Sequence, residues 1–361
     1  MKVGLIGLPR AGKTTVFRAL TSAPAAEESR TAERPGRGAA GRRGELRVIK
    51  VPDPRVDALA AVFRPRKTTH AEIAFADLPG PAEGEELFAD PATADLVKGC
   101  DALALVVRAF DAPEVPHPRG SVDPARDLAT VETEMALLDL MAVERRAARL
   151  AKERRVQAVE AEAIGKAKAW LEAERPLRTL ALSEAERKAL AGFRFLSEKP
   201  LLVVANLGDT GEAGLAALEA EAARRALPVV ALRGRIEMEV AALPPEEQAA
   251  FLASFGLTEP ARDQFIRAAY ALADLVTFLT GGDDEVRAWP IRRGTAAQQA
   301  AGKIHSDMAR GFIRAEVIPF EEFMALPQRT FAKAREAGKL RLEGKDYVVQ
   351  DGDIIIFRFA V

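Results

Sequence analysis

The first residues with recognisable chemistry follow a short apolar run at the N-terminus. Gly7–Thr14 reads GLPRAGKT and fits the spacing G-x-x-x-x-G-K-[ST], between an expected strand at Met1–Ile6 and an expected helix at Thr14–Leu20. Glycines let successive backbone N–H groups curl around a phosphate, and the N-terminus of the following helix favours negative charge. In such a loop Lys13 reaches the β- and γ-phosphates, and the Thr14 hydroxyl ligates Mg²⁺. The pattern predicts a nucleoside triphosphate site rather than a chance match.

A second motif supplies an acidic side chain. Asp77–Gly80 (DLPG) follows directly on Ile73–Ala76, an apolar run that predicts a strand. A carboxylate at a strand end can join Thr14 around Mg²⁺, and the glycine three residues on can offer its N–H to the γ-phosphate. Alone this pattern is weak, because Asp and Gly are common in turns. Its place downstream of the phosphate loop strengthens it.

A third motif, Asn206–Asp209 (NLGD), follows the expected strand Leu201–Ala205. The Asp209 carboxylate can accept from guanine N1–H and the 2-amino group, a pair that adenine lacks. A plain strand-to-helix turn explains this motif about equally well. The expected nucleotide contacts are Pro9, Arg10, Ala11, Gly12, Lys13, Thr14, Thr15, Gly80, Asn206, Leu207, Asp209 and Leu232. The expected catalytic residues are Lys13, Thr14 and Arg10, and the expected Mg²⁺ ligands are Thr14 and Asp77.

These motifs must be positioned by alternating strands and helices. Further apolar runs at Leu46–Val51, Leu103–Val107 and Val229–Leu232 predict strands, and their alternation with helical segments predicts a doubly wound, parallel α/β sheet. From Pro124 to Glu174 the apolar spacing is helical, which predicts an inserted antiparallel hairpin of coiled-coil character. In a small C-terminal α+β domain, Tyr347–Phe357 predicts a β-hairpin across an Asp-Gly turn.

The three motifs, in this order, resemble those of the YchF family of Obg-related P-loop GTPases. Segments similar to that family extend over nearly the whole chain. They are Val51–Arg55, Val106–Phe110, Val122–Asp127, Gly192–Leu196, Glu285–Trp289, Ala301–His305, Gly311–Val317 and Leu342–Tyr347.

The resemblance implies a Ras-like nucleotide domain, an inserted helical hairpin and a C-terminal TGS-like domain of β-grasp form. It also implies nucleotide hydrolysis, an association with ribosomes, and a frequent preference for ATP over GTP. On this basis we expect the nucleotide-binding domain in residues 1–123 and 197–276, the helical hairpin in residues 124–196, and the TGS-like domain in residues 277–361.

Three departures from the family concern catalysis. Arg10 stands where the family usually has an asparagine, which in related enzymes helps to hold potassium; whether potassium acts here stays open. Arg10 either stabilises the transition state with its positive charge or, as we favour, is an exposed loop arginine without a catalytic role. Gly41 replaces the usual switch I threonine, with Thr31 a distant substitute, which puts the usual loop closure in question. Pro81 follows Gly80 where Ras-like enzymes carry a catalytic glutamine, so we expect slow turnover.

The fourth departure concerns the base. Leu207 cannot supply the lysine stem that packs on the base, and Asp209 replaces the family's glutamate. The shorter carboxylate suits guanine while the resemblance favours adenine, so GTP/GDP and ATP/ADP both stay open as ligands. Two functions follow. One is a slow, Mg²⁺-dependent GTPase or ATPase that serves as a ribosome- or RNA-associated translation or stress factor. The other is a nucleotide-gated ribosome- or RNA-binding module with vestigial hydrolysis.

Composition narrows the remaining classes. The 361 residues are 48% hydrophobic and 29% charged, as in globular proteins, and the single cysteine, Cys100, suits a reducing, cytoplasmic compartment. No apolar run is long enough for a membrane span. The net charge of −1 excludes a globally basic RNA binder. The basic loop within residues 30–67 is either solvated or, with the TGS-like domain, contacts ribosome or RNA. We expect a monomer and, because three scattered histidines lack ligand spacing, no zinc site.

Overall fold

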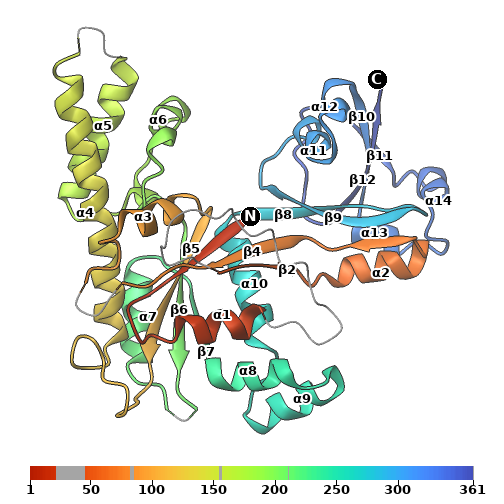
Figure 1. Ribbon diagram of the computed structural model, residues 1–361. Coiled ribbons are helices and arrows are strands. Elements are labelled where there is room, and N and C mark those ends of the chain that lie inside the picture. Colours follow the sequence, from red (N-terminus) through yellow and green to blue (C-terminus); the bar gives the residue numbers. More distant parts are fainter. Residues whose placement is uncertain (22–44, 82–84, 154–156, 210, 361) are drawn as a thin grey trace, which may run out of the picture. The chain divides into compact units, whose positions relative to one another are not determined.

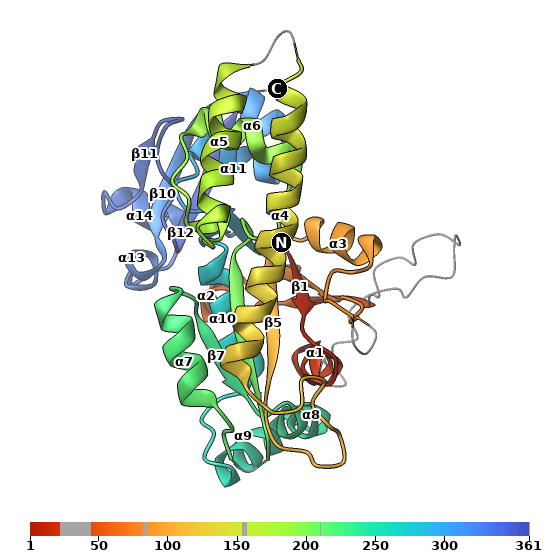
Figure 2. The same cartoon turned by 90° about the vertical axis from the view of Figure 1, so that its left-hand side faces the viewer.

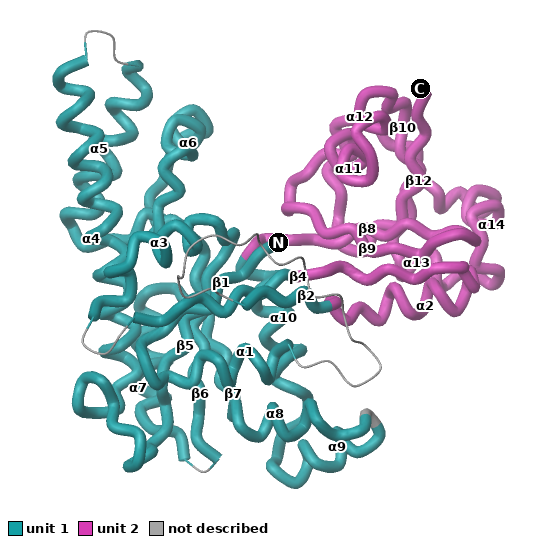
Figure 3. The backbone as a smooth tube through the Cα atoms, in the orientation of Figure 1, with its two compact units in different colours: residues 1–49, 74–272 teal, residues 50–73, 273–361 magenta. Residues whose placement is uncertain are grey.

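The computed structural model describes residues 1–21, 45–81, 85–153, 157–209 and 211–360. The chain forms two compact units (Figure 3), of which unit 1 comprises residues 1–49 and 74–272 and unit 2 comprises residues 50–73 and 273–361. Gly41, Thr31 and residues 30–44 of the basic loop lie outside the described residues, so the expectations about them stay predictions.

Unit 1 is built around a six-stranded sheet (Figures 1 and 2). In order across the sheet, the strands are β2 (Glu45–Lys50), β4 (Glu72–Asp77), β1 (Lys2–Ile6), β5 (Ala102–Ala109), β6 (Leu201–Leu207) and β7 (Val229–Leu232). β1 pairs in parallel with β4 and β5, β5 with β6, and β6 with β7, and Leu5 lies opposite Asp77. The prediction of a doubly wound parallel sheet is therefore confirmed.

Helices cover both faces of this sheet. One face carries α1 (Lys13–Thr21), α8 (Gly234–Ala242) and α10 (Ala261–Leu272), and α9 (Pro245–Ser254) packs on α8. The other face carries α3 (Pro91–Lys98), α4 (Pro124–Leu150) and α7 (Leu215–Arg224). β5 is buried at every position because, apart from Arg108, it is apolar, and because helices cover both faces of the sheet, as in other parallel sheets.

The expected helical hairpin is present as α4 and α5 (Ala158–Glu172), which run antiparallel and pack along their length (Figure 1). α4 begins at Pro124 because Asp123 caps it by accepting a hydrogen bond from the Arg126 N–H (3.0 Å). The short α6 (Glu184–Leu190) follows with a capping box. None of the described helices is both long and apolar enough to cross a membrane.

Buried carboxylates on α4 hold two other segments of unit 1. Glu134 accepts a hydrogen bond from the Phe88 N–H (2.7 Å), in the segment that follows Asp77–Gly80. Asp139 accepts one from the Ser197 N–H (2.7 Å), at the end of the hairpin. Burial raises the pKa of both carboxyls, and the hydrogen bonds oppose that rise. α4 thus links the helical hairpin to the segment after Gly80.

Unit 2 holds a second six-stranded sheet. In order, its strands are β11 (Arg341–Glu343), β10 (Phe312–Pro319), β12 (Asp353–Phe359), β8 (Leu275–Thr280), β9 (Glu285–Arg292) and β3 (Lys67–Thr69). β8 and β9 form an antiparallel hairpin, β12 lies parallel to β8, and α11 (Ala297–Ile304) packs on one face, next to α12 (Ser306–Arg310). This is the expected β-grasp arrangement.

Residues 50–73 belong to unit 2, whereas we expected all of residues 1–123 in the nucleotide-binding domain. The reason is pairing over a long sequence distance: β3 lies parallel to β9, with Lys67 opposite Glu285, and extends the second sheet. No local pattern in the sequence marks such pairing. The other expected domain boundaries stay predictions.

The predicted hairpin at Tyr347–Phe357 is wrong. Only β12 forms a strand there, and it pairs with β10 and β8, while Val348 makes an isolated bridge to Ala296. The Asp-Gly turn exists, with φ of 83° at Gly352, but Asp351 Oδ1 accepts a hydrogen bond from the Thr277 N–H (2.7 Å). The turn is therefore held by β8 rather than by a partner strand.

Two contacts hold α2 (Pro54–Phe63) within unit 2. At its end, Phe63 stacks on Phe323 of α13 (Phe320–Met324) and on Phe331 of α14 (Phe331–Glu336), with ring centroids 5.6 Å apart in both pairs. At its start, the Arg55 guanidinium donates to both oxygens of Asp53 (3.0 and 2.9 Å) and to Asp351 Oδ2 (2.7 Å). Since Asp53 is buried, its carboxylate depends on this cation.

We predict that Arg55→Ala lowers the free energy of unfolding of unit 2 by about 2 kcal/mol, because it leaves the buried Asp53 carboxylate without its cation. The matched control is Arg66→Ala, which breaks an exposed pair with Asp284 (3.3 Å) and costs at most about 0.5 kcal/mol. Urea unfolding followed by Trp289 fluorescence, in a Trp170→Phe background, measures both. Equal losses in the two variants would contradict the prediction.

Candidate functional site

The loop between β1 and α1 needs glycine at two positions. A Cβ on Gly7 would lie 2.5 Å from the Val106 carbonyl oxygen of β5. Gly12 has a backbone φ of 81°, which residues other than glycine rarely adopt. A Cβ at this position would also collide with the Asn206 amide nitrogen. The loop is therefore packed closely against β5 and β6, and its glycines serve this close approach.

Lys13 and Asp77 meet at the carboxyl ends of β1 and β4. The Lys13 ammonium donates a hydrogen bond to the Leu78 carbonyl oxygen, and its Nζ lies 3.4 Å from Asp77 Oδ1. Burial lowers the pKa of Lys13, while the Asp77 carboxylate opposes that shift. The structure thus brings together two residues from separate sequence motifs, 64 positions apart, as the parallel pairing of β1 with β4 requires.

Thr14 and Asp77 present the oxygens that Mg²⁺ prefers. Thr14 Oγ1 donates to Asp77 Oδ2 (3.0 Å), and Asp77 Oδ1 is buried without a hydrogen bond from any described residue. No group of three or more His, Cys, Asp or Glu suited to a metal occurs among the described residues. Mg²⁺ commonly takes one or two protein oxygens and completes its shell with phosphates and water, so this pair fits Mg²⁺.

Asn206, at the end of β6, braces the loop. Its amide nitrogen donates to the Ala11 carbonyl oxygen (3.0 Å), and its amide oxygen accepts from the Gly234 N–H (3.3 Å) at the start of α8. The side chain is only 4% exposed. We expected Asn206 to contact the nucleotide, and the structure adds a positioning role, because this residue holds the phosphate loop against α8.

The predicted base-reading residues gather at the ends of β6 and β7. Leu207 and Leu232 have buried side chains, so their backbone is what they can offer to a ligand. Asp209 Oδ2 lies 3.4 Å from Arg235 Nη1, and Arg233 donates to the Asp209 carbonyl oxygen (3.2 Å). Neither arginine is among the site residues expected from the sequence, although their place just after the predicted strand Val229–Leu232 is a usable signal.

Arg10 reaches the loop that follows β5. Its φ is 64°, and its Nη1 donates to the Pro116 carbonyl oxygen (2.8 Å). That loop is shaped by Arg108, which is 2% exposed and donates to the carbonyl oxygens of Phe110 (3.0 Å) and Val115 (2.8 Å). The sequence shows an arginine directly after the apolar run Leu103–Val107, but it indicates neither the burial of Arg108 nor its carbonyl partners.

His117, in the same loop, forms a buried pair with Asp127 of α4 (Nε2–Oδ2 2.9 Å). Burial lowers the pKa of His117, and the carboxylate opposes that shift. From the sequence, His117 is expected only to lack zinc-ligand spacing. Its pairing with Asp127, ten positions away, is not expected, because the fold brings the two side chains together.

The remaining expected site residues lie between β1 and α1, at the start of α1 and after β4. Ala11 is buried, while Pro9 and Thr15 are half-buried. A Cβ on Gly80 would lie 3.8 Å from Lys13 Nζ, so this glycine stands beside the lysine head. Pro81 follows it and is half-buried.

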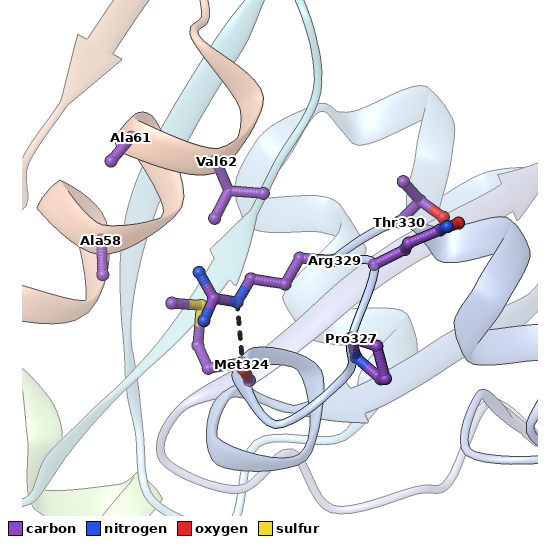
Figure 4. Close-up of a pocket in the computed structure, with 8 residues that line it drawn as sticks. Ala58, Ala61, Val62, Met324, Pro327, Arg329 and Thr330 are labelled. Atoms are coloured by element: carbon purple, nitrogen blue, oxygen red, sulfur yellow. Dashed lines mark hydrogen bonds between the residues drawn. The ribbon is translucent and has the colours of Figure 1, made fainter.

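A pocket of about 710 Å³ in unit 2 contains none of these residues (Figure 4). Its lining residues are Ala58, Ala61, Val62, Met324, Pro327, Gln328, Arg329 and Thr330. Arg329 Nε donates to the Met324 carbonyl oxygen (3.0 Å), as Figure 4 shows. Most of the lining side chains are small and apolar, and none is acidic or a histidine, so we assign the pocket no chemistry.

Two family models match the chain. One, described as 50S ribosome-binding GTPase, matches residues 2–145, and the other, named for the C-terminal part of the YchF GTPases and described as a protein of unknown function, matches residues 275–360. The Ribosome-binding ATPase YchF of Bacillus subtilis is 38% identical over 375 residues, with 100% of both chains covered. That of Escherichia coli O157:H7 is 38% identical and covers 100% of this chain and 99% of its own.

Solved structures agree with these matches. The YchF GTPase of Schizosaccharomyces pombe superposes with a TM-score of 0.85 at 28% identity, and the match covers 99% of this chain and 97% of that one. A GTP binding protein from Pyrococcus horikoshii OT3, at 18% identity and a TM-score of 0.61, shows the fold alone, over 100% of both chains. Identity over the full length, together with the arrangement of Lys13, Thr14 and Asp77, establishes that the chain belongs to the YchF family of P-loop nucleoside triphosphatases.

Proposed function

We propose that this protein binds a nucleoside triphosphate with Mg²⁺, hydrolyses it slowly, and acts in association with the ribosome. The observation that carries the proposal is the meeting of Lys13, Thr14 and Asp77 at one edge of the parallel sheet. Ligands of doubly wound sheets bind at the carboxyl ends of the strands, which is where these three residues lie.

The roles of the three residues follow from their contacts. The Lys13 ammonium exchanges the Leu78 carbonyl oxygen for phosphate oxygens, and its burial strengthens its attraction to them. Thr14 and Asp77 would hold Mg²⁺, which would neutralise negative charge on the phosphates. Pro81 stands in the position of a water-orienting glutamine and has no side-chain donor, which supports slow turnover.

We further propose ATP as the preferred nucleotide. Guanine recognition needs the Asp209 carboxylate, and that carboxylate is already paired with Arg235. Guanine must displace the Arg235 cation to bind the Asp209 carboxylate, whereas adenine has no pair of donors that needs this carboxylate. The 38% identical relatives from Bacillus subtilis and Escherichia coli are named ATPases, which supports the same choice. GTP remains the alternative, because the matching family model of residues 2–145 is that of a GTPase.

The proposed partner is the ribosome, since the same relatives are named ribosome-binding. A ribosomal partner implies that the protein acts in the cytoplasm. The single cysteine of the chain, Cys100, is buried and suits that reducing compartment. We propose that the protein acts there as a monomer. Contacts with RNA would come from the basic loop within residues 30–67 and from unit 2.

We predict that Lys13→Ala reduces single-turnover ATP hydrolysis by at least about 100-fold, because the transferring phosphoryl group loses its cation. The matched control is Lys199→Ala. That lysine is also partly buried and donates to a carbonyl oxygen (Cys100, 2.6 Å), but it lies at the amino ends of β5 and β6. It should alter stability and leave hydrolysis within about threefold. Hydrolysis that survives Lys13→Ala would instead favour a different catalytic cation.

We predict that Gly12→Ala weakens ATP binding by at least about tenfold, because the added Cβ displaces Asn206 and with it the brace on the phosphate loop. Gly294→Ala is the control: its φ of 84° matches, so it carries the same backbone strain, but nothing lies within 4 Å of the added atom. Titration with a fluorescent ATP analogue measures both. An equal loss of affinity in both variants would show that the brace is not needed.

We predict that Arg235→Ala raises the affinity for GTP relative to ATP by about threefold, because it frees the Asp209 carboxylate for guanine from an exposed ion pair worth less than about 1 kcal/mol. Asp209→Ala should leave ATP binding within about threefold. Glu239→Ala, which removes the other carboxylate near Arg235 (3.6 Å), is the control and should change neither affinity. Competition between the two nucleotides reports the ratio directly. A wild-type protein that prefers GTP would refute the proposal of ATP.

A further inference from the structure

Two arginines lie side by side on one face of the unit 2 sheet. Opposite residues on neighbouring strands point to the same side. Arg314 of β10 lies opposite Arg358 of β12, and Glu316 lies opposite both Ile356 of β12 and Leu342 of β11. The alternate residues of β10 and β12 point the other way, into the apolar core under α11. The first set therefore lies on the face of the sheet that α11 does not cover. Further along the same two strands this face is apolar and buried, at Ile318 and Ile354.

Arg335, from α14, completes this surface (Figure 2 shows α14 close to β10 and β11). We call it the arginine face and define it as Arg314, Arg335 and Arg358, together with Glu316 and Leu342. Glu316 stands at its centre and is 4% exposed, although it points away from the apolar core. The three arginines, which are 48 to 57% exposed, cover it.

The contacts to Glu316 are close and divided between its two oxygens. Arg358 donates from Nε to Oε1 (3.1 Å) and from Nη2 to Oε2 (3.2 Å), and Arg335 donates from Nη2 to Oε2 (2.8 Å). Arg314 Nη2 lies 3.9 Å from Oε1. The hydrogen bond from Arg358, then that from Arg335, lowers the pKa of Glu316 against the effect of burial. Within the described chain, no other carboxylate pairs with these three arginines.

Three guanidinium groups around one carboxylate leave an excess of two positive charges. Placing Arg314 directly opposite Arg358 brings like charges together, which by itself is unfavourable. Arg358 and Arg335 already donate hydrogen bonds to both oxygens of the buried carboxylate, whereas Arg314, at 3.9 Å, adds positive charge without a hydrogen bond. The carboxylate does hold the guanidinium groups in place, which lowers the entropy cost of a later contact.

We propose that the arginine face binds the phosphate backbone of RNA. This proposal rests on the proposed association with the ribosome and names the surface that makes the contact. Guanidinium groups fixed side by side match the successive phosphates of one strand, and binding them releases counterions. An acidic peptide would have to order a separate flexible side chain for each carboxylate it presented. Leu342, which is 63% exposed beside the arginines, offers an apolar contact to riboses and bases.

The test uses the full-length protein and a fluorescent 20-nucleotide oligouridylate, titrated at several KCl concentrations. We expect Arg335→Gln with Arg358→Gln to weaken binding about tenfold at 100 mM KCl. We also expect the slope of log affinity against log salt to become shallower by about 1.4, since each lost phosphate contact contributes about 0.7 for a single strand. Unchanged affinity and slope would overturn the proposal.

The matched control is Lys333→Gln with Lys339→Gln, which removes the same charge from the same unit. These lysines pair with Glu336 (2.6 Å) and Glu322 (3.2 Å) rather than with Glu316. We expect the control to bind within about twofold of wild type, and an equal loss in the control would overturn the proposal. Polyglutamate that displaces the RNA at equal charge concentration would also overturn it, in favour of an acidic protein partner.

A second variant keeps the test valid if the glutamine variant unfolds. Arg335→Lys with Arg358→Lys retains the charge but loses the guanidinium fork, and we expect it to bind the RNA about threefold more weakly. Affinity at the wild-type level would contradict the proposed role of the fork.

Co-sedimentation with ribosomes separates this inference from the proposed function. If the wild-type protein does not sediment with ribosomes, the proposed association itself is wrong. If wild type and the glutamine variant sediment equally and bind the oligouridylate equally, only the arginine face is excluded. ATP hydrolysis by the isolated glutamine variant should equal that of wild type, because none of its altered residues belongs to the phosphate site.

Discussion

The ion pair of Lys13 with Asp77 is the interaction on which the proposed nucleotide site depends. It exists because β1 and β4 lie side by side and parallel, so that their carboxyl ends meet at one edge of the sheet. The other features of the site serve this meeting. Gly7 lets the loop pass the β5 backbone, and Asn206 holds the loop against the start of α8. Thr14 shares the carboxylate and completes the pair of oxygens suited to Mg²⁺.

Much of this site could be predicted from the sequence because its parts are local. The phosphate loop carries its own geometry within eight residues, and the apolar runs that precede each motif predict the strand ends where the motifs must lie. The brace at Asn206 could not be predicted, because it depends on which strands become neighbours. The carbonyl partners of Arg108 could not be predicted either, because they depend on how the loop after β5 folds back over the arginine. The pair of Arg235 with Asp209 likewise joins two strand ends that only the sheet brings together.

The two failures in the fold have the same cause. Tyr347–Phe357 looked like a hairpin because its turn residues and its apolar residues are adjacent in sequence, and such local signals are the ones that sequence reasoning detects. In the structure, the pairing partners of β12 are far away in the chain. Residues 50–73 carried no signal at all for their partners, since Phe63 and β3 are completed by residues more than 200 positions later.

The place of residues 50–73 has a consequence for how the molecule can be divided. The chain passes between the two units three times, after residues 49, 73 and 272. The first two crossings lie at the two ends of residues 50–73, and this segment ends four residues before Asp77. A gene segment that encodes only residues 273–361 therefore does not encode a whole unit, because it lacks an edge strand and a helix. A single cut in the chain therefore cannot separate the two units. For the same reason, a simple end-to-end fusion of two genes could not have produced this arrangement.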